Sequence, residues 1–222
     1  MPDYTLHHGD CMDIMPTLDL SCVDAVLCDP PYGCKNDCSY RNISGGSAEN
    51  LDKLAECRKD FEPIRNDSTP FNPAHLLSFP KAIIWGYQFM ADKLPQGTVL
   101  VWQKKTFVEL GTILSDGEIA WQKGNKGVYI YEHRWNGFLR ATERGKTLHP
   151  TQKPVALMRW CLDRLKLDPG ATVLDPYMGS GPVGVACAEA GYKYIGIEIE
   201  EDYYNIAKSR IDAAYEQTSL FV

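Results

Sequence analysis

The stretch ATVLDPYMGSGPVGVACAEAGYKYIGIE, residues 171–198, decides the fold of this chain. Its first part, Ala171–Leu174, is a short apolar run that predicts a buried strand, and the small apolar residues of Pro182–Ala190 predict a helix. A second apolar run at Tyr194–Ile197 predicts another strand. A strand, a helix and a strand in this order predict a parallel pair joined by a right-handed crossover.

The segments on either side extend this pattern. Val155–Leu165 has apolar residues at helical spacing after Pro154, which suits a first helical turn, and Tyr203–Ala214 predicts a final amphipathic helix. Further elements are predicted upstream: strands at Cys22–Cys28, Ala82–Trp85 and Thr98–Trp102, and a short helix at Gln88–Leu94. The fold class is therefore α/β, with an open, mostly parallel twisted sheet, helices on both faces and a Rossmann-like order.

The chain has the size and composition of one globular domain. It contains 222 residues, of which 44% are hydrophobic and 23% charged, so we expect a single domain over 1–222. Two segments, 34–73 and 103–148, remain outside the predicted sheet core and are candidates for recognising whatever this domain binds. Residues 34–73 show neither a helical nor a strand period, and a loop of this length is usually functional or disordered.

No apolar run approaches the ~20 residues that a membrane helix needs, and Met1–His8 lacks the basic and apolar regions of a signal peptide. Eight cysteines, several inside apolar strand or helix patterns, then predict reduced thiols in a cytoplasmic protein with no membrane partner. Cys34, Cys38 and Cys57 resemble part of a metal site, but no Cys-x2-Cys pair completes it. No metal is predicted.

The loop Asp29-Pro30-Pro31-Tyr32-Gly33 follows the predicted strand Cys22–Cys28. Two prolines cannot continue a strand ladder, so the strand ends there and presents an acid and a ring at its carboxyl edge. Ligands of open α/β sheets bind at that edge. Fixed carbonyl acceptors beside a flat ring suit an exocyclic amino group on a planar base. Taken alone, the tetrapeptide is equally typical of a stiff turn.

The glycine turn Asp175-x-x-x-Gly179-x-Gly181 links the strand and helix of the deciding stretch. Glycines allow close approach to a ligand, and the helix start supplies amide donors. Glu198 ends the next strand about 20 residues on, the position from which a carboxylate accepts bonds from ribose hydroxyls. Pro182 after Gly181 excludes a P-loop. Asp175 would repel a pyrophosphate and favours a ligand with an amino group, so an adenosyl cofactor with an amino-acid tail fits better than NAD.

Five ordered motifs together resemble a known family. They are Leu6–Cys11, Asp29–Gly33, His149–Pro154, Leu174–Gly181 and Gly196–Glu198, with Tyr203 and Arg210-Ile211 in register behind them. The chain resembles S-adenosylmethionine-dependent DNA amino-methyltransferases in the permuted β order, in which Asp-Pro-Pro-Tyr precedes the glycine loop. The resemblance spans both ends of the chain and is loose in the middle. It implies S-adenosylmethionine as cofactor and duplex DNA, with the target base flipped out, as substrate.

The resemblance also implies roles for individual residues. The catalytic set is Asp29, Pro30, Pro31 and Tyr32. The cofactor set is Asp10 and Cys11 at the adenine, Glu198 at the ribose, Asp175, Tyr177, Gly179 and Gly181 at the methionine moiety, Thr151 and Lys153 near its carboxylate, and also Asp29, Ser180 and Ile199. Tyr177 stands where family members usually have Phe, and we expect little consequence, since both are aromatic.

The predicted reaction is methyl transfer to the N6 amino group of adenine in DNA. The Asp29 carboxylate and the Pro30 carbonyl would accept hydrogen bonds from the two N–H groups and so aim the nitrogen lone pair at the methyl group. Tyr32 would stack on the base. Cytosine N4 is the first alternative, and the family pattern, with Asp first in the loop, favours adenine. RNA and a protein glutamine amide also stay open as substrates, and a catalytically idle DNA-binding module stays open as a non-enzymatic function.

A basic stretch with interleaved aromatic residues lies in the middle of the chain. Its basic residues are Lys123, Lys126, Arg134, Arg140, Arg144 and Lys146. They are candidates for nucleic-acid contacts, and a solvated loop with a hairpin is the alternative. The net charge of −6 argues against a protein that coats nucleic acid. Little of the chain remains for reading bases, which suggests a short site or help from a second subunit, so a homodimer stays open.

Overall fold

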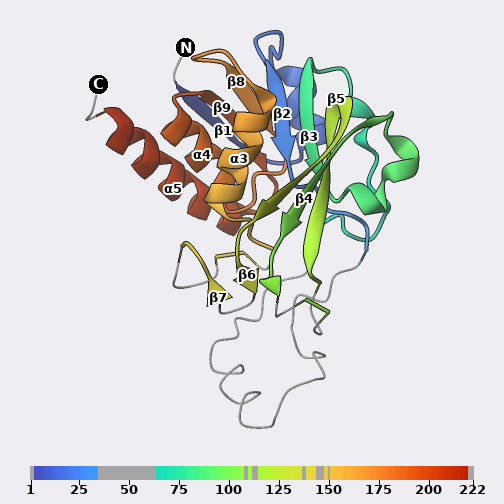
Figure 1. The fold of residues 1–222 in the computed structure, drawn as a ribbon. Coiled ribbons are helices and arrows are strands. Elements are labelled where there is room, and N and C mark those ends of the chain that lie inside the picture. The colour runs from blue at the N-terminus through green and yellow to red at the C-terminus, as the bar shows by residue number, and fades with distance from the viewer. Residues whose placement is uncertain are drawn as a thin grey trace.

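The computed structural model describes residues 3–34, 64–107, 110–111, 115–136, 139–143, 148–149 and 151–219. Within these ranges a seven-stranded sheet has the order β1-β9-β8-β2-β3-β5-β4 (Figure 1). Its strands are β1 (Tyr4–His8), β2 (Ala25–Cys28), β3 (Lys81–Trp85), β4 (Gly97–Gln103), β5 (Gly117–Glu132), β8 (Thr172–Asp175) and β9 (Lys193–Glu198). A separate short hairpin consists of β6 (Trp135–Asn136) and β7 (Leu139–Arg140).

The helices fall into two groups. The α-helices are α1 (Cys11–Ile14), α3 (Val155–Leu165), α4 (Pro182–Ala190) and α5 (Glu201–Ser219). The 3₁₀ helices are η1 (Met15–Thr17), η2 (Pro73–Leu76), η3 (Tyr87–Phe89) and η4 (Ala91–Lys93). Helices α3, α4 and α5 pack side by side on one face of the sheet (Figure 1). The short helices α1, η2 and η3 contribute to the core on the other face.

Strand direction brings the ends of several strands to one edge. β1, β9, β8, β2 and β3 pair in parallel, so their carboxyl ends share that edge. β5 runs antiparallel to β3. The first half of β5 pairs with β4 in opposite directions, from Gly97 with Lys123 to Gln103 with Gly117. The second half of β5 pairs with β4 in parallel. Because Val99 pairs with both Trp121 and Val128, the two halves of β5 flank β4.

Two apolar cores form because successive residues of a strand point to opposite faces. In β2, Ala25 and Leu27 pack in the core beneath α3, α4 and α5, while Val26 and Cys28 pack in the core on the other face. All four residues are fully buried. A strand covered on both faces needs an uninterrupted apolar run, which is the pattern that predicted it.

The predicted α/β class is confirmed, with differences in individual elements. Helices α3 and α4 have the predicted bounds. The helix expected over Gln88–Leu94 is wrong: the chain forms η3 and η4 there, interrupted at Met90, whose φ is −142° and whose side chain is fully buried. β1 and β5 were not predicted as sheet elements, and the β6–β7 hairpin falls in the basic stretch for which a loop with a hairpin was the alternative prediction.

Three of the cysteines expected in apolar segments, Cys28, Cys161 and Cys187, are buried free thiols. Cys38 and Cys57 lie outside the described residues. Among the helices that the structure describes, each is too short or too polar to cross a bilayer.

Candidate active site

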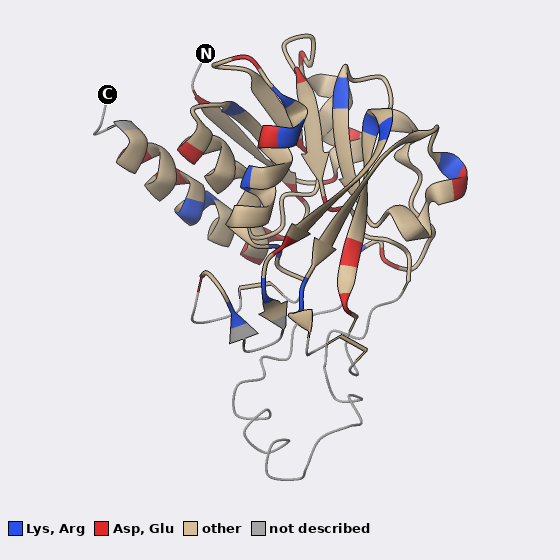
Figure 2. Cartoon of the chain, in the orientation of Figure 1, with Lys and Arg blue, Asp and Glu red and all other residues tan. Residues whose placement is uncertain are grey.

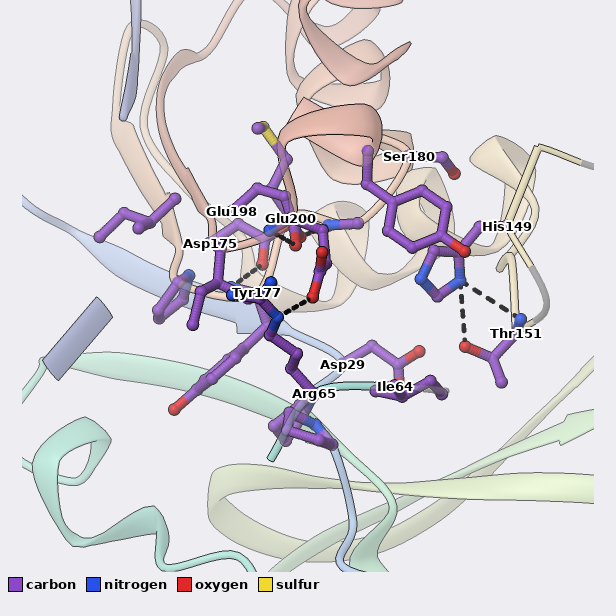
Figure 3. Close-up of a pocket in the computed structure, with 18 of the residues that line it drawn as sticks. Asp29, Ile64, Arg65, His149, Thr151, Asp175, Tyr177, Ser180, Glu198 and Glu200 are labelled. Carbon is purple, nitrogen blue, oxygen red and sulfur yellow. Dashed lines mark hydrogen bonds and ion pairs between the residues drawn. The ribbon is translucent and has the colours of Figure 1, made fainter. Parts of the chain in front are cut away.

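A cavity of about 460 Å³ opens at the carboxyl edge of the sheet, within the size range of small-molecule sites. The loops after β1, β2, β8 and β9 line it, together with residues 64–67, 148–149 and 151–153 (Figure 3). The predicted residues that line it are Asp10, Cys11, Asp29, Pro30, Pro31, Tyr32, Thr151, Lys153, Asp175, Tyr177, Gly179, Ser180, Glu198 and Ile199. Gly181 is not among the lining residues. The structure thus gathers the two predicted sets from distant parts of the chain.

The glycine loop after β8 is held by the acid that ends β9. The Gly179 amide donates to Glu198 Oε2 at 2.7 Å, and the Glu200 amide donates to Oε1 at 2.9 Å. Burial raises the pKa of Glu198, and these backbone amides oppose that rise. Gly181 has φ +76°, and a Cβ there would lie 3.0 Å from the Ala207 Cβ, so glycine lets the loop pack against α5.

Asp175 is a second buried carboxyl group in this cavity. Its Oδ1 accepts from the Tyr177 amide at 3.2 Å, and its Oδ2 accepts from the Tyr194 hydroxyl at 3.3 Å. Only 1% of the residue is exposed, and this burial raises its pKa to about 8. A cationic ligand beside Asp175 would favour the ionised form.

Tyr177 uses the hydroxyl that distinguishes it from Phe. Its oxygen lies 3.1 Å from His75 Nε2, and its ring meets the Phe71 ring edge-on at 5.5 Å between centroids. The prediction that Tyr177 in place of Phe has little consequence therefore overlooked the hydrogen bond between Tyr177 and His75 of η2. On the other side of the cavity, Asp10 caps α1 by accepting from the Met12 amide at 2.9 Å, and Cys11 is buried.

The loop after β2 is fixed at both ends. Asp29 Oδ1 accepts a short hydrogen bond from the Tyr32 hydroxyl. Gly33 adopts φ +79°, and its amide donates to Asp67 Oδ1 at 2.7 Å. The Tyr32 ring lies against the backbone of Gly86, where a Cβ would be 2.1 Å from Tyr32 Cε1, so glycine is needed for the ring to occupy this place.

Lys153 and Thr151, expected side by side at one end of a cofactor, have different partners. The Lys153 ammonium lies 2.5 Å from Asp29 Oδ2 and 3.0 Å from Glu118 Oε2. The Thr151 hydroxyl lies 3.2 Å from His149 Nδ1 (Figure 3). Burial and the nearby Lys153 lower the pKa of His149 to about 4, so this ring is neutral at neutral pH.

Sequence reasoning missed three side chains at this site as site residues. His149 lies in one of the five motifs but was assigned no role; its ring stands 4.3 Å from that of Tyr203. Arg65 reaches across the cavity to Glu200 Oε1 at 2.5 Å (Figure 3). Glu118 contacts Lys153 from β5. The motif around His149 was a usable signal, whereas Arg65 and Glu118 lie in segments without one.

The comparisons with known proteins agree with this geometry. A family model described as DNA methylase, of the N6/N4 methyltransferase kind, matches residues 122–209. The Type II methyltransferase M2.DpnII of Streptococcus pneumoniae is 38% identical to this chain, with 95% of this chain and 90% of the relative covered. The chain belongs to the N6/N4 family of DNA methyltransferases. The putative methylase YubD of Escherichia coli K12 is 28% identical over 92% of this chain and 88% of its own.

Solved structures of methyltransferases share the fold. The crystal structure of the M1.HpyAVI–SAM complex matches with a TM-score of 0.54 and 26% identity, covering 93% of this chain and 99% of that one. PvuII DNA methyltransferase, described as cytosine-N4-specific, matches with a TM-score of 0.57 and 13% identity over 98% and 94% of the two chains. This second likeness concerns the fold alone.

This methyltransferase depends on S-adenosylmethionine, as its family does. The residues present fit that cofactor in chemical type. Asp175 is a buried acid that a cationic group would ionise, and Glu198 is a carboxylate held by two backbone amides at the end of β9. The cavity between them is continuous with Asp29.

Within the described residues, the members of the predicted basic stretch do not form one cluster. Lys123 pairs with Gly97 at the start of β4, so it lies at the edge opposite the cavity, and its ammonium donates to the carbonyls of Leu77 and Phe79. Lys126 follows at the same end. Arg134 and Arg140 belong with the β6–β7 hairpin, where the Trp135 amide donates to the carbonyl of Lys104 beyond the end of β4. Figure 2 shows basic residues at both edges of the sheet. Arg144 and Lys146 lie outside the described residues.

Proposed function

We propose that this methyltransferase modifies the N6 amino group of adenine in duplex DNA, with the base flipped into the pocket beside Asp29. One observation carries the proposal: Asp29, Pro30 and Tyr32 line the same cavity as Asp175 and Glu198. An acceptor carboxylate next to a cofactor site is what amino-group methylation needs, because the nitrogen lone pair must be directed at the methyl group.

In the proposed reaction the Asp29 carboxylate and the Pro30 carbonyl accept hydrogen bonds from the two N–H groups of the amino nitrogen. Bound S-adenosylmethionine supplies an activated methyl group on its sulfonium. The acceptors stabilise the positive charge that develops on the nitrogen as the N–C bond forms and the C–S bond breaks, and the nitrogen becomes neutral again by releasing one proton to solvent. Asp175 and Glu198 would hold the methionine moiety and the ribose, with Asp10 and Cys11 at the adenine.

Tyr32 has two tasks in this proposal. In the structure its hydroxyl donates to Asp29 Oδ1, the oxygen left by Lys153, and its ring stacks on Phe89 at 4.9 Å between centroids. A target amino group that reaches Oδ1 must displace that hydroxyl. The ring is then free to stack on the flipped base, a contact worth about 1–3 kcal/mol per base.

Adenine is preferred over cytosine because Asp begins the loop, a pattern that the family resemblance associates with adenine. Cytosine N4 is the second candidate, because the matching family model covers both N6 and N4 methyltransferases. Both targets are amino groups on flat rings, so the acceptors described above serve either base.

The test is transfer of tritiated methyl from S-adenosylmethionine to unmethylated duplex DNA, followed by nucleoside analysis. We expect label in N6-methyladenine. Label in N4-methylcytosine would retain the mechanism and refute the choice of base. Label in RNA or in a protein glutamine, with none in DNA, would refute the proposed substrate.

Target recognition is assigned in this proposal to segments 34–73 and 103–148. Residues 35–63 lie outside the part of the chain that the structure describes. The described remainder places the β6–β7 hairpin and residues 64–67 at the cavity edge, the side from which DNA would have to approach.

A further inference from the structure

Four charged side chains form a chain of contacts that begins at Asp29. Lys153 Nζ is 2.5 Å from Asp29 Oδ2 and 3.0 Å from Glu118 Oε2. Lys104 Nζ is 2.5 Å from Glu118 Oε1. The Lys153 side chain is only 4% exposed. The charges alternate in sign: Asp29 lies in the loop after β2 and Lys153 just before α3, whereas Glu118 lies in β5 and Lys104 directly follows β4.

We propose that Lys153 is a positioning residue for Asp29, and that Glu118, itself paired with Lys104, holds Lys153 in place. The inference rests on the proposed function, in which Asp29 accepts the amino group of the base. It replaces the expected role of Lys153 at the cofactor carboxylate and adds Glu118, which the sequence motifs do not include.

Geometry supports this role for Lys153. An acceptor carboxylate must be oriented to within a fraction of an ångström of the reacting nitrogen. Lys153 occupies Oδ2 of Asp29, so the N–H group of the base is directed to Oδ1, where it displaces the Tyr32 hydroxyl. A lysine with one carboxylate partner could rotate away, whereas Lys153 has two, because Glu118 faces it from β5.

Electrostatics supports the same role. Burial raises the pKa of Asp29, Lys153 opposes that rise, and Glu118 adds to it. Burial would also raise the pKa of Glu118, but Lys153 and Lys104 outweigh it and bring that pKa to about 2, so Glu118 stays an anion. The other titratable groups that face Asp29 are Tyr32, Cys28 and Asp175.

The two charged partners should therefore shift the ionisation of Asp29 in opposite directions. Lys153→Met removes the cation and exposes Asp29 to Glu118, so the pKa of Asp29 should rise. Glu118→Gln removes the negative charge but keeps a side-chain oxygen that can accept from Lys153, so Lys153 stays beside Asp29 and the pKa of Asp29 should fall. Lys105→Met is a matched control: Lys105 is as buried as Lys153 and is paired with Asp116 at 2.8 Å, so its removal should leave the pKa of Asp29 unchanged.

The measurement is ¹³C NMR titration of carboxyl-labelled aspartate in the full chain without substrate, with the Asp29 signal assigned through Asp29→Asn. Opposite shifts in Lys153→Met and Glu118→Gln, with none in Lys105→Met, support the inference. An unchanged pKa of Asp29 in either of the first two variants would overturn it. Should Lys153→Met fail to fold, Glu118→Gln still decides. Because no methyl transfer is involved, this result does not depend on whether DNA is the substrate.

Kinetics with DNA and cofactor provide the second readout. Lys153→Met should lower kcat by about 100-fold, the scale of a 1 Å misplacement, and leave the cofactor Kd unchanged. The low-pH limb of the kcat profile should move to higher pH in Lys153→Met and to lower pH in Glu118→Gln. A raised cofactor Kd, with the low-pH limb of the kcat profile unchanged, would show that Lys153 binds the cofactor and would refute the inference. Absence of transfer by the unmodified enzyme would refute the proposed function alone.

Discussion

Asp29 and Asp175 are two carboxyl groups of one cavity with different surroundings, the first half-buried and the second fully buried. Lys153 lies against Asp29, whereas Asp175 receives one amide and one tyrosine hydroxyl and has the anions Asp29 and Glu198 nearby. Burial therefore raises the pKa of Asp175 to about 8. Within the proposed function, Asp29 accepts a hydrogen bond from the amino group of the base, and Asp175 binds a cationic group of the cofactor.

Cofactor affinity should depend on the ionisation of Asp175. A cationic ligand binds the carboxylate better, and Asp175 takes up a proton as the pH falls through about 8. The cofactor Kd should therefore fall as the pH rises from about 6 to about 8 and level off above it. Calorimetric titrations across this range measure the effect, and Asp175→Asn should flatten the profile. An equally steep profile in Asp175→Asn would contradict this role.

At the scale of single residues, sequence reasoning found the groups that belong to contiguous motifs. Asp29 follows β2 directly and Glu198 ends β9, and both line the cavity. Glu118 had no such signal, because it is one acid within a strand and acquires its partners only when β5 lies beside Lys153. The hydroxyl of Tyr177 was discounted because its partner, His75, lies in a distant segment.

The loop between β8 and α4 connects element geometry to the site. Gly181 is the N-cap of α4 with φ +76°, Pro182 follows at the first turn, and Arg210 of α5 donates to the carbonyl of Ser180 at 2.6 Å. A side chain at Gly181 would press on Ala207 and Ile211. The loop, α4 and α5 therefore hold one another in place.

Gly181→Ala should destabilise the fold through both conformation and packing. The left-handed conformation costs a β-carbon about 1–2 kcal/mol, and overpacking adds about 1–3 kcal/mol. Gly170→Ala is the control, since Gly170 has φ +75° with nothing within 4 Å of an added Cβ. Urea unfolding should show a larger loss for Gly181→Ala. Equal losses would mean that packing against α5 contributes nothing.

Elements were predictable where the local pattern agreed with the final packing. β8, α4 and β9 follow one another closely and are mostly apolar, so their periods were clear. β1 was missed because Tyr4–His8 contains two histidines, and β5 because Gly124 and Gly127 interrupt it. The strand character of β5 comes from pairing with β3 and β4, which no local pattern records.

At the scale of the whole molecule, the parallel strands put all catalytic and cofactor candidates at one edge and Lys123 and Lys126 at the other. The basic stretch is continuous in sequence, but the second half of β5 runs from the edge with Lys126 to the edge with the cavity. Arg140, whose guanidinium lies 4.4 Å over the Trp135 ring, is on the cavity side.

DNA binding should therefore depend on Arg140 and not on Lys126. Arg140→Ala should weaken affinity and reduce the dependence of log K on log salt by about one unit, as expected for one lost phosphate contact. Lys126→Ala should change neither quantity. Fluorescence anisotropy with a labelled duplex at several salt concentrations measures both. Equal effects of the two substitutions would show that DNA also contacts the opposite edge.

In the proposed function, the Asp29 carboxylate directs the amino group of a DNA base to the methyl donor. The most direct test of this role is the single-turnover rate of methyl transfer to unmethylated duplex DNA by the unmodified enzyme and by Asp29→Ala, with cofactor Kd measured in parallel. We expect a loss of at least about 100-fold in rate, the scale of removing one transition-state contact, with cofactor affinity retained. An unchanged rate in Asp29→Ala would contradict this role.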